Sequence, residues 1–162
     1  LFSVEWSPSD ATRVASGAAG AALQQSAFDR GALACAAQQL GAGQQLIDMG
    51  ALYATQRKQF GVAIGTFQAV KHRLANAQVK VEYARAVVYR AAHSVATGQA
   101  ERSLDVSMAK VAAGEAALFA AKEALQVHGA IGYTYEQDLH VWMKRAWSLD
   151  LAFGTGAWHR TS

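Results

Sequence analysis

The residues of this sequence best suited to chemistry form two short clusters. The first is Arg57-Lys58-Gln59-Phe60-Gly61, followed after a short spacer by Phe67-Gln68. An arginine beside a tight turn, with a helix beginning just beyond, could bind a phosphate group, because guanidinium groups and helix N-termini both favour phosphate. A solvated loop with incidental charge explains the same residues equally well, so the pattern alone leaves both interpretations open.

A second cluster spans residues 126–136 and has the sequence QVHGAIGYTYE. The small residues Gly129, Ala130 and Gly132 would let a flat or extended ligand approach the backbone, with Gln126 and His128 as polar partners. Aromatic side chains in and after this cluster could line a pocket, but they belong more often to a helical core. They are Tyr133, Tyr135, Trp142 and Trp147. From the residues alone, the structural interpretation is favoured.

Other kinds of catalytic site find little support. A di-iron site in a helical bundle needs two Glu-x-x-His pairs and two further glutamates, whereas this sequence offers Glu136 and His140, four residues apart. We therefore predict a surface contact between these two side chains and no metal site. The single cysteine, Cys35, has no histidine within local reach, and the sequence contains neither a Gly-x-Ser-x-Gly motif nor a phosphate-binding Gly-Lys-Ser/Thr loop.

The composition indicates one helical domain. The chain has 162 residues, 52% of them hydrophobic and 17% charged, which is enough apolar material for one core but too short for two ordinary domains. It contains 36 alanines and one proline, the best and the worst helix former. Positive charges are scattered, so nucleic-acid binding is not expected. Because no apolar stretch approaches 18 residues and no secretory signal is recognisable, we expect a cytoplasmic protein without membrane insertion.

Hydrophobic periodicity predicts the helices that must position the two clusters. They cover residues 27–54, 67 to about 97, 103–128 and 136–153, and the short loops between them favour an all-α fold, an antiparallel four-helix bundle. Residues 15–20 are glycine-rich and are predicted to be a connecting loop. Residues 1–6 alternate like a β-strand, but no later segment could pair with them. We therefore expect this strand to be the remnant of a neighbouring β-domain.

The same periodicity predicts which face of each helix is buried. The clearest signal is on the second helix, where apolar residues recur at steps of three and four from Phe67 to Val95. Gly41 and Gly43 predict that another helix, or less favourably a ligand, approaches the first helix closely. The face predicted for the first helix is Leu33, Ala36, Leu40, Ile47 and Ala51, and for the third helix Leu104, Met108, Val111, Leu118 and Leu125.

The two clusters, in this order, resemble the acyl-CoA dehydrogenase family. Arg57-x-Gln-Phe-Gly with the following Phe67-Gln68 is similar to the family's Arg-x-x-Phe-Gly loop. Residues 126–146 are similar to its late signature, in a variant common among members that act on steroid and other bulky acyl groups. The resemblance covers nearly the whole chain from Phe28 onward. It implies a C-terminal helical bundle domain at 27–162, preceded at 1–26 by the end of a middle β-domain and a linker.

The resemblance also implies an activity and its partners. Members of the family introduce an α,β double bond into an acyl-CoA, with a glutamate removing the α-proton while FAD takes the β-hydride. The expected partners are an acyl-CoA substrate, FAD and a homologous subunit in a dimer or tetramer. Electron-transfer flavoprotein is the expected electron acceptor.

The resemblance assigns roles to individual residues. Arg57 is expected to reach the pyrophosphate of the FAD of a neighbouring subunit, and Asp29 matches an acidic residue that faces the substrate. The family's usual Thr-Ser pair is here Thr155-Gly156, which removes one hydroxyl contact to FAD. The further residues expected at the cofactor are Gln59, Phe60, Gln68, Gln126, Val127, His128, Gly129 and Ala130.

The chain departs from the family at the catalytic base. Most members carry the glutamate just before the Gly-Thr pair, where this sequence has Phe153, and a minority carry it on the first bundle helix, where it has Gly31. Asp150, one turn before Phe153, is a weak substitute. We therefore hypothesise a subunit without the base that completes the FAD site of a partner chain. There are two alternatives: an active homomeric enzyme with a relocated base, at Asp150, Glu136 or another residue, and a non-enzymatic helical scaffold that has lost FAD.

Overall fold

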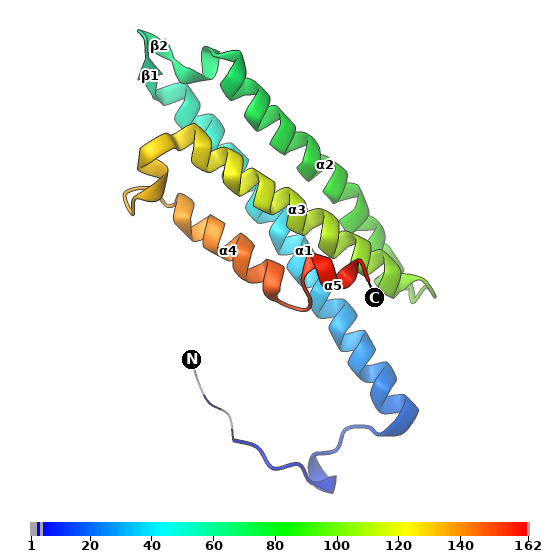
Figure 1. The fold of residues 1–162 in the computed structure, drawn as a ribbon. Coiled ribbons are helices and arrows are strands. Elements are labelled where there is room, and N and C mark those ends of the chain that lie inside the picture. The colour runs from blue at the N-terminus through cyan, green and yellow to red at the C-terminus, as the bar shows by residue number, and fades with distance from the viewer. Residues whose placement is uncertain (1–2, 4, 162) are drawn as a thin grey trace.

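The computed structural model describes residue 3 and residues 5–161, and this part of the chain is an antiparallel bundle of helices (Figure 1). The helices are α1 Gly17–Gln56, α2 Gln68–Thr97, α3 Arg102–His128, α4 Leu139–Leu151 and the short α5 Gly156–His159. Short 3-10 helices cover Asp10–Thr12, Ile64–Thr66 and Gly129–Tyr133. Strands β1 Lys58–Gln59 and β2 Val62–Ala63 form an antiparallel hairpin in which Lys58 lies opposite Ala63. The prediction of an all-α four-helix bundle is confirmed.

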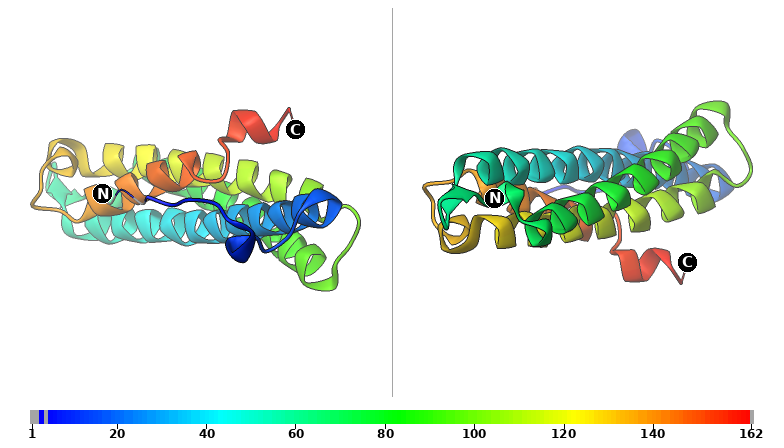
Figure 2. Two further views of the ribbon diagram at one scale, coloured as in Figure 1. Left: turned by 90° about the horizontal axis from the view of Figure 1, so that it is seen from below. Right: turned by 90° about the horizontal axis from the view of Figure 1, so that it is seen from above.

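Helix α3 lies between the other long helices, and α1, α2 and α4 all contact it, whereas α5 stands to one side of the bundle (Figure 2). Because alanine side chains end at Cβ, they let neighbouring backbones approach closely. A Cβ added to Gly43 of α1 would lie 3.3 Å from Val81 Cγ2 and 3.4 Å from the Cα of Ala117, which confirms the predicted close crossing at this residue. At Gly41 the prediction is wrong, because an added Cβ there would meet nothing within 4 Å. The buried alanines of α3 are Ala109, Ala113, Ala116, Ala117, Ala120, Ala121 and Ala124.

The face predicted to be buried on α3 is wrong. Leu104 is 61% exposed and Met108 is 50% exposed, while Val111, Leu118 and Leu125 are half-buried. The space between α3 and its neighbours is narrow, so it admits alanine and excludes leucine. Leu104 and Met108 therefore lie on the outer side of α3, whereas Leu125 packs, half-buried, against the core. On α1 the prediction fails at one residue, since Ala51 is exposed, and on α2 the predicted seam is buried from Ala77 to Ala91.

The N-terminal prediction also needs correction. Residues 15–20 are not a loop, because α1 begins at Gly17 and the amide of Gly20 donates to the carbonyl of Ser16 at 3.2 Å. The alanines between these glycines outweigh the helix penalty of glycine. Residue 3 and residues 5–9 form no strand, and the rest of the predicted strand lies outside the described residues.

None of the helices in the described part of the chain has an apolar stretch long enough to cross a bilayer.

The fourth helix is shorter than predicted at both ends. It begins at Leu139 and ends at Leu151, because a 3-10 helix and a turn occupy the preceding residues and the chain leaves helical geometry at Ala152. Glu136 therefore lies outside the helix, and the predicted helical contact with His140 is wrong. The His140 ring instead packs against Tyr135, with 4.7 Å between the ring centroids.

A buried carboxylate joins α2 to α3. Asp105 of α3 is 3% exposed and accepts hydrogen bonds from Ser94 Oγ at 2.5 Å and Arg90 Nε at 2.8 Å, both on α2. The Ser94 hydrogen bond, and then that of Arg90, holds the pKa of Asp105 below its ordinary value. The charged form of Asp105 is thus the form that stabilises the packing of α2 on α3.

We expect this carboxylate to make stability depend on acidity. Because the pKa of Asp105 is lower in the folded than in the unfolded chain, its contribution is present above the unfolded pKa of about 3.9 and is lost as the pH falls through the folded pKa. Asp105→Asn should lower the free energy of unfolding at neutral pH by about 1–3 kcal/mol and flatten its acid dependence. Urea unfolding across acidic pH measures both effects. Asp138→Asn, at the exposed N-cap residue of α4 whose carboxylate accepts no capping hydrogen bond from the helix, is the control. An unchanged acid dependence in Asp105→Asn would contradict this assignment.

Candidate functional site

The first cluster forms an exposed hairpin at one end of the bundle. Phe60 and Gly61 have φ values of +54° and +83°, and a two-residue hairpin turn with positive φ at both positions matches the twist of its strands. This conformation is strained for phenylalanine, yet the Phe60 side chain is 92% exposed and touches Phe67 edge-on at 6.2 Å between centroids. Gln59 and Gln68 are exposed nearby, on β1 and at the start of α2. The hairpin thus presents polar and aromatic groups outward.

The second cluster lies at the end of α3. His128 of this cluster is 5% exposed, and the Nδ1–H of its ring donates a hydrogen bond to the carbonyl of Ala124 at 2.8 Å. The ring stacks on Tyr53 of α1, with 4.4 Å between centroids and 21° between planes. Gly129 ends the helix with φ +64°. Among its neighbours, Val127 is buried, while Gln126 and Ala130 are exposed.

The structure brings Arg57 and His128 to one pocket. This pocket has a volume of about 330 Å³ and lies between α1 and the end of α3. A guanidinium beside two stacked rings suits an anionic group joined to a flat ring system, so these residues fit a dinucleotide cofactor. Sequence reasoning missed Tyr53, although it lies one helical turn before Arg57. The lining residues are Met49, Leu52, Tyr53, Gln56, Arg57, His128, Ile131 and Gln137.

The two positions discussed for a catalytic base are in contact. Phe153 follows α4 with φ +53°, and its ring lies over Gly31 of α1. A Cβ added to Gly31 would lie 2.2 Å from the nearest Phe153 ring carbon, which is well inside van der Waals contact. Phe28 packs edge-on against the same ring at 6.0 Å between centroids. The ring therefore occupies the space that any side chain at residue 31 would need.

The acidic residues nearest this contact in the sequence, Asp29 and Asp150, interact with residues other than Phe153 and Gly31. Asp29 is 2% exposed and accepts hydrogen bonds from Gln25 Nε2 and Ser103 Oγ, both at 2.8 Å, and Arg102 Nε lies 3.7 Å from its Oδ2. Asp29 also borders a cavity of about 500 Å³ between α1, α3 and α5. The Asp150 carboxylate lies over Gly114 of α3, where an added Cβ would be 2.8 Å from Oδ1. The buried amide of Gln39 adjoins the same point, about 12 Å along α1 from Gly31.

Thr155 and Gly156 begin the short helix α5. The Thr155 Oγ1 accepts a hydrogen bond from the amide of Trp158 at 3.3 Å and so caps α5. This turn packs near the start of α3, whereas Arg57 and His128 lie at its far end. The distance from Lys110, beside the turn, to His128 is about 27 Å along the helix. The predicted cofactor residues therefore fall into two separate groups.

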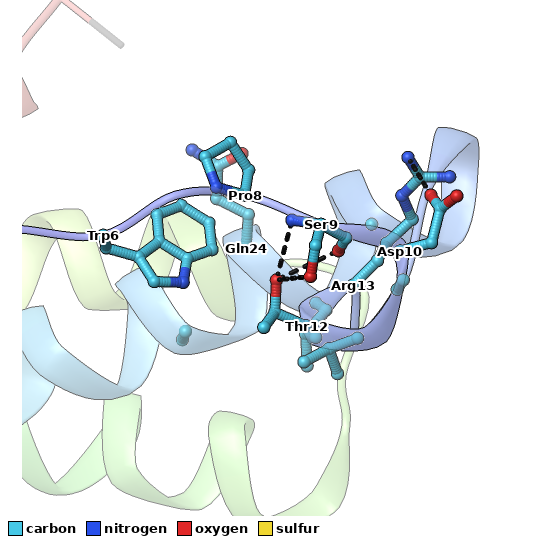
Figure 3. Close-up of a pocket in the computed structure, with 12 residues that line it drawn as sticks. Trp6, Pro8, Ser9, Asp10, Thr12, Arg13 and Gln24 are labelled. Atoms are coloured by element: carbon cyan, nitrogen blue, oxygen red, sulfur yellow. Dashed lines mark hydrogen bonds and ion pairs between the residues drawn. The ribbon is translucent and has the colours of Figure 1, made fainter.

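A further hollow of the described chain lies at the N-terminal end of α1. It has a volume of about 770 Å³ and is formed where residues 6–15 fold back along the first turns of α1 (Figure 3). Figure 3 shows the hydrogen bonds between Ser9 and Thr12 and the ion pair between Arg13 and Asp10. The ion pair is 2.7 Å long. These contacts are local to the segment before α1. No residue predicted to act at a site lines this hollow.

We expect Gly31 to be required because of Phe153. Gly31→Ala should lower the free energy of unfolding by about 1–3 kcal/mol, since the methyl group would clash with the ring. Gly41→Ala, on the exposed side of the same helix with no neighbour within 4 Å, should instead raise it by up to about 1 kcal/mol. In a Phe153→Ala background the cost at Gly31 should disappear. Chemical unfolding of the four variants tests this, and a stabilising Gly31→Ala single variant would show that the ring does not occupy this space.

Comparisons with known proteins agree with these features. The family model for the "Acyl-CoA dehydrogenase, C-terminal domain" matches residues 18–162. Acyl-CoA dehydrogenase IpdE2 of Mycobacterium tuberculosis (strain ATCC 25618 / H37Rv) is 42% identical over 118 residues, which are 73% of this chain and 35% of that protein. This chain spans about a third of the length of the curated relatives it matches.

Solved structures show the same fold. The structure of butyryl-CoA dehydrogenase from Megasphaera elsdenii matches with a TM-score of 0.85 at 29% identity, over 90% of this chain and 38% of that one. A chain of the ChsE4-ChsE5 complex from Mycobacterium tuberculosis matches with a TM-score of 0.79 at 30% identity, again over 90% of this chain and 38% of that one. Both matches extend over nearly the whole helical bundle.

Proposed function

Because the chain belongs to the acyl-CoA dehydrogenase family, we propose that it is the C-terminal helical domain of a flavoprotein that introduces an α,β double bond into an acyl-CoA. FAD, when bound, supplies the hydride acceptor for this oxidation. The late signature at residues 126–146 supports a bulky, steroid-type acyl group. Since α1 is continuous through residues 26 and 27, we place the start of this domain at Gly17 and the connection to a preceding β-domain before it.

The pocket of Arg57 and His128 supports a contribution to FAD binding. The exposed guanidinium of Arg57 suits the pyrophosphate, and the stacked rings of Tyr53 and His128 border the same pocket, where a flat ring system could lie. Thr155 belongs to the other group of residues, about 27 Å away along α3. This separation fits a chain that contributes Thr155 to one FAD and Arg57 to the FAD of a neighbouring subunit.

The contact between Phe153 and Gly31 carries the proposal that this chain lacks the catalytic base. A phenyl ring fills the space between the two positions where the family places its glutamate, and neither residue can accept a proton. Asp150 lies over Gly114 instead, and Glu136 lies before α4, at the other end of that helix from Phe153. A subunit of this kind completes the FAD site of a partner chain that carries the base.

A homologous partner subunit is supported by the likeness to the ChsE4-ChsE5 complex, which pairs two differently named chains. The large apolar residues on the outer side of α3, Leu104 and Met108 among them, offer such a partner an apolar contact surface. Electron-transfer flavoprotein remains the electron acceptor that we propose.

Native mass spectrometry of the complete protein tests this function. We expect this chain in complex with a different homologous chain and fewer FAD molecules than chains. A homo-oligomer with one FAD per chain would overturn the proposed base-lacking subunit, and a complex without FAD would support the scaffold alternative. Arg57→Gln should lower the FAD count, because it removes the cation from the pocket. Lys122→Gln, an equal change of charge at an exposed residue of α3, should leave the count unchanged.

A relocated base makes a different prediction. If Asp150 or Glu136 removed the α-proton, Asp150→Asn or Glu136→Gln would lower turnover by a factor on the order of 10²–10⁴. We expect both variants to turn over acyl-CoA as fast as the unaltered complex, because neither carboxylate lies at the Phe153–Gly31 contact. Steady-state kinetics of the complete complex measures this. A loss in either variant would identify the relocated base and refute the proposal that this chain has none.

A further inference from the structure

Side chains of α3 and α5 form hydrogen bonds to the backbone of the turn between α4 and α5. The buried Lys110 donates from Nζ to the carbonyl of Asp150 at 3.0 Å. The buried His159 donates from Nε2 to the carbonyl of Phe153 at 2.9 Å, and its Nδ1 accepts from Ser107 Oγ at 3.0 Å. Ser107 and Lys110 are neighbours on one face of α3. Two backbone carbonyls of one short segment are therefore fixed by one region of α3.

The backbone of this turn needs external support. Phe153 and Gly154 have φ values of +53° and +90°, and the first of these is an unfavourable conformation for phenylalanine. The carbonyl of Asp150 lies at the C-terminal end of α4, where helix carbonyls lack partners within the helix. A lysine ammonium at this end supplies a hydrogen bond and a favourable charge. The hydrogen bonds from Lys110 and His159 thus stabilise a conformation that the local sequence does not favour.

The polar groups that hold the turn are costly to bury. Lys110 is fully buried, and burial lowers its pKa as well as that of His159. A neutral imidazole fits the observed contacts, since Nε2 then donates to Phe153 and Nδ1 accepts from Ser107. An apolar side chain at residue 110 would fill the same space without the free-energy cost of removing an ammonium group from water. A role in holding the turn accounts for a lysine at this position.

We propose that Lys110, Ser107 and His159, together called the clamp, are positioning residues. They fix the turn 152–155, and with it Thr155, for binding of the flavin cofactor. The proposal rests on the proposed function for the role of Thr155. The link is direct in the chain, because Thr155 follows Gly154 and caps the helix that carries His159. Shifting the carbonyl of Phe153 would therefore shift Thr155 with it.

Four variants of the complete protein test this clamp. His159→Leu and Ser107→Ala remove the hydrogen bonds to and through the imidazole, and His159→Gln keeps an amide N–H that can donate to Phe153. Ser94→Ala is the matched control, because it removes one serine hydrogen bond to α3, at Asp105, that does not involve the turn or His159. The measurements are amide hydrogen exchange of residues 152–156 in the FAD-free protein and the FAD dissociation constant.

We expect amide exchange in the turn and the FAD dissociation constant to rise about tenfold in His159→Leu and Ser107→Ala, as for the loss of one hydrogen bond. His159→Gln should restore both values, and Ser94→Ala should change neither. Unchanged exchange in His159→Leu, or an equal rise in Ser94→Ala, would overturn the clamp. Faster exchange with unchanged FAD affinity would overturn its role toward the cofactor. Absence of FAD binding by the unaltered protein would instead overturn the proposed function, while the exchange measurement would still test the clamp.

Discussion

The close approach of three helices to the alanine face of α3 is the constraint on which the rest of the structure depends. Where α1 crosses it, a Cβ at residue 43 would lie only 3.4 Å from the Cα of Ala117, so the two backbones are nearly in contact. Larger side chains on this face would separate the helices and remove the dispersion contacts that stabilise a densely packed core. Leu104 and Met108 of α3 are consequently exposed on its outer side.

The same central helix keeps two functional regions apart. The Arg57 and His128 pocket adjoins its C-terminal end, and the turn that carries Phe153 and Thr155 rests on its N-terminal half. A rigid helix of 27 residues fixes this separation. This separation supports the proposal that the chain contributes to two different FAD sites, because one dinucleotide bound at one end of α3 would not reach both regions.

The residues near Phe153 form one coupled unit. Its ring requires glycine at residue 31, while its backbone carbonyl depends on His159, and that imidazole depends on Ser107. A substitution at any of these residues therefore changes the packing or the hydrogen bonds of the others. The proposed absence of a base in this chain therefore concerns several packed residues and not Phe153 alone.

Local patterns in the sequence determined that the chain forms three long helices and a shorter fourth, and they marked the two chemically suited clusters. Each of these depends on residues within a few turns of one another, where helical periodicity and turn chemistry act. The buried face of α3 could not be read in the same way, because it depends on the width of the space left by three neighbouring helices. Tertiary structure alone brought Tyr53 and His128 together, and it alone placed Phe153 over Gly31. Such contacts join residues far apart in the chain, and no local periodicity specifies them.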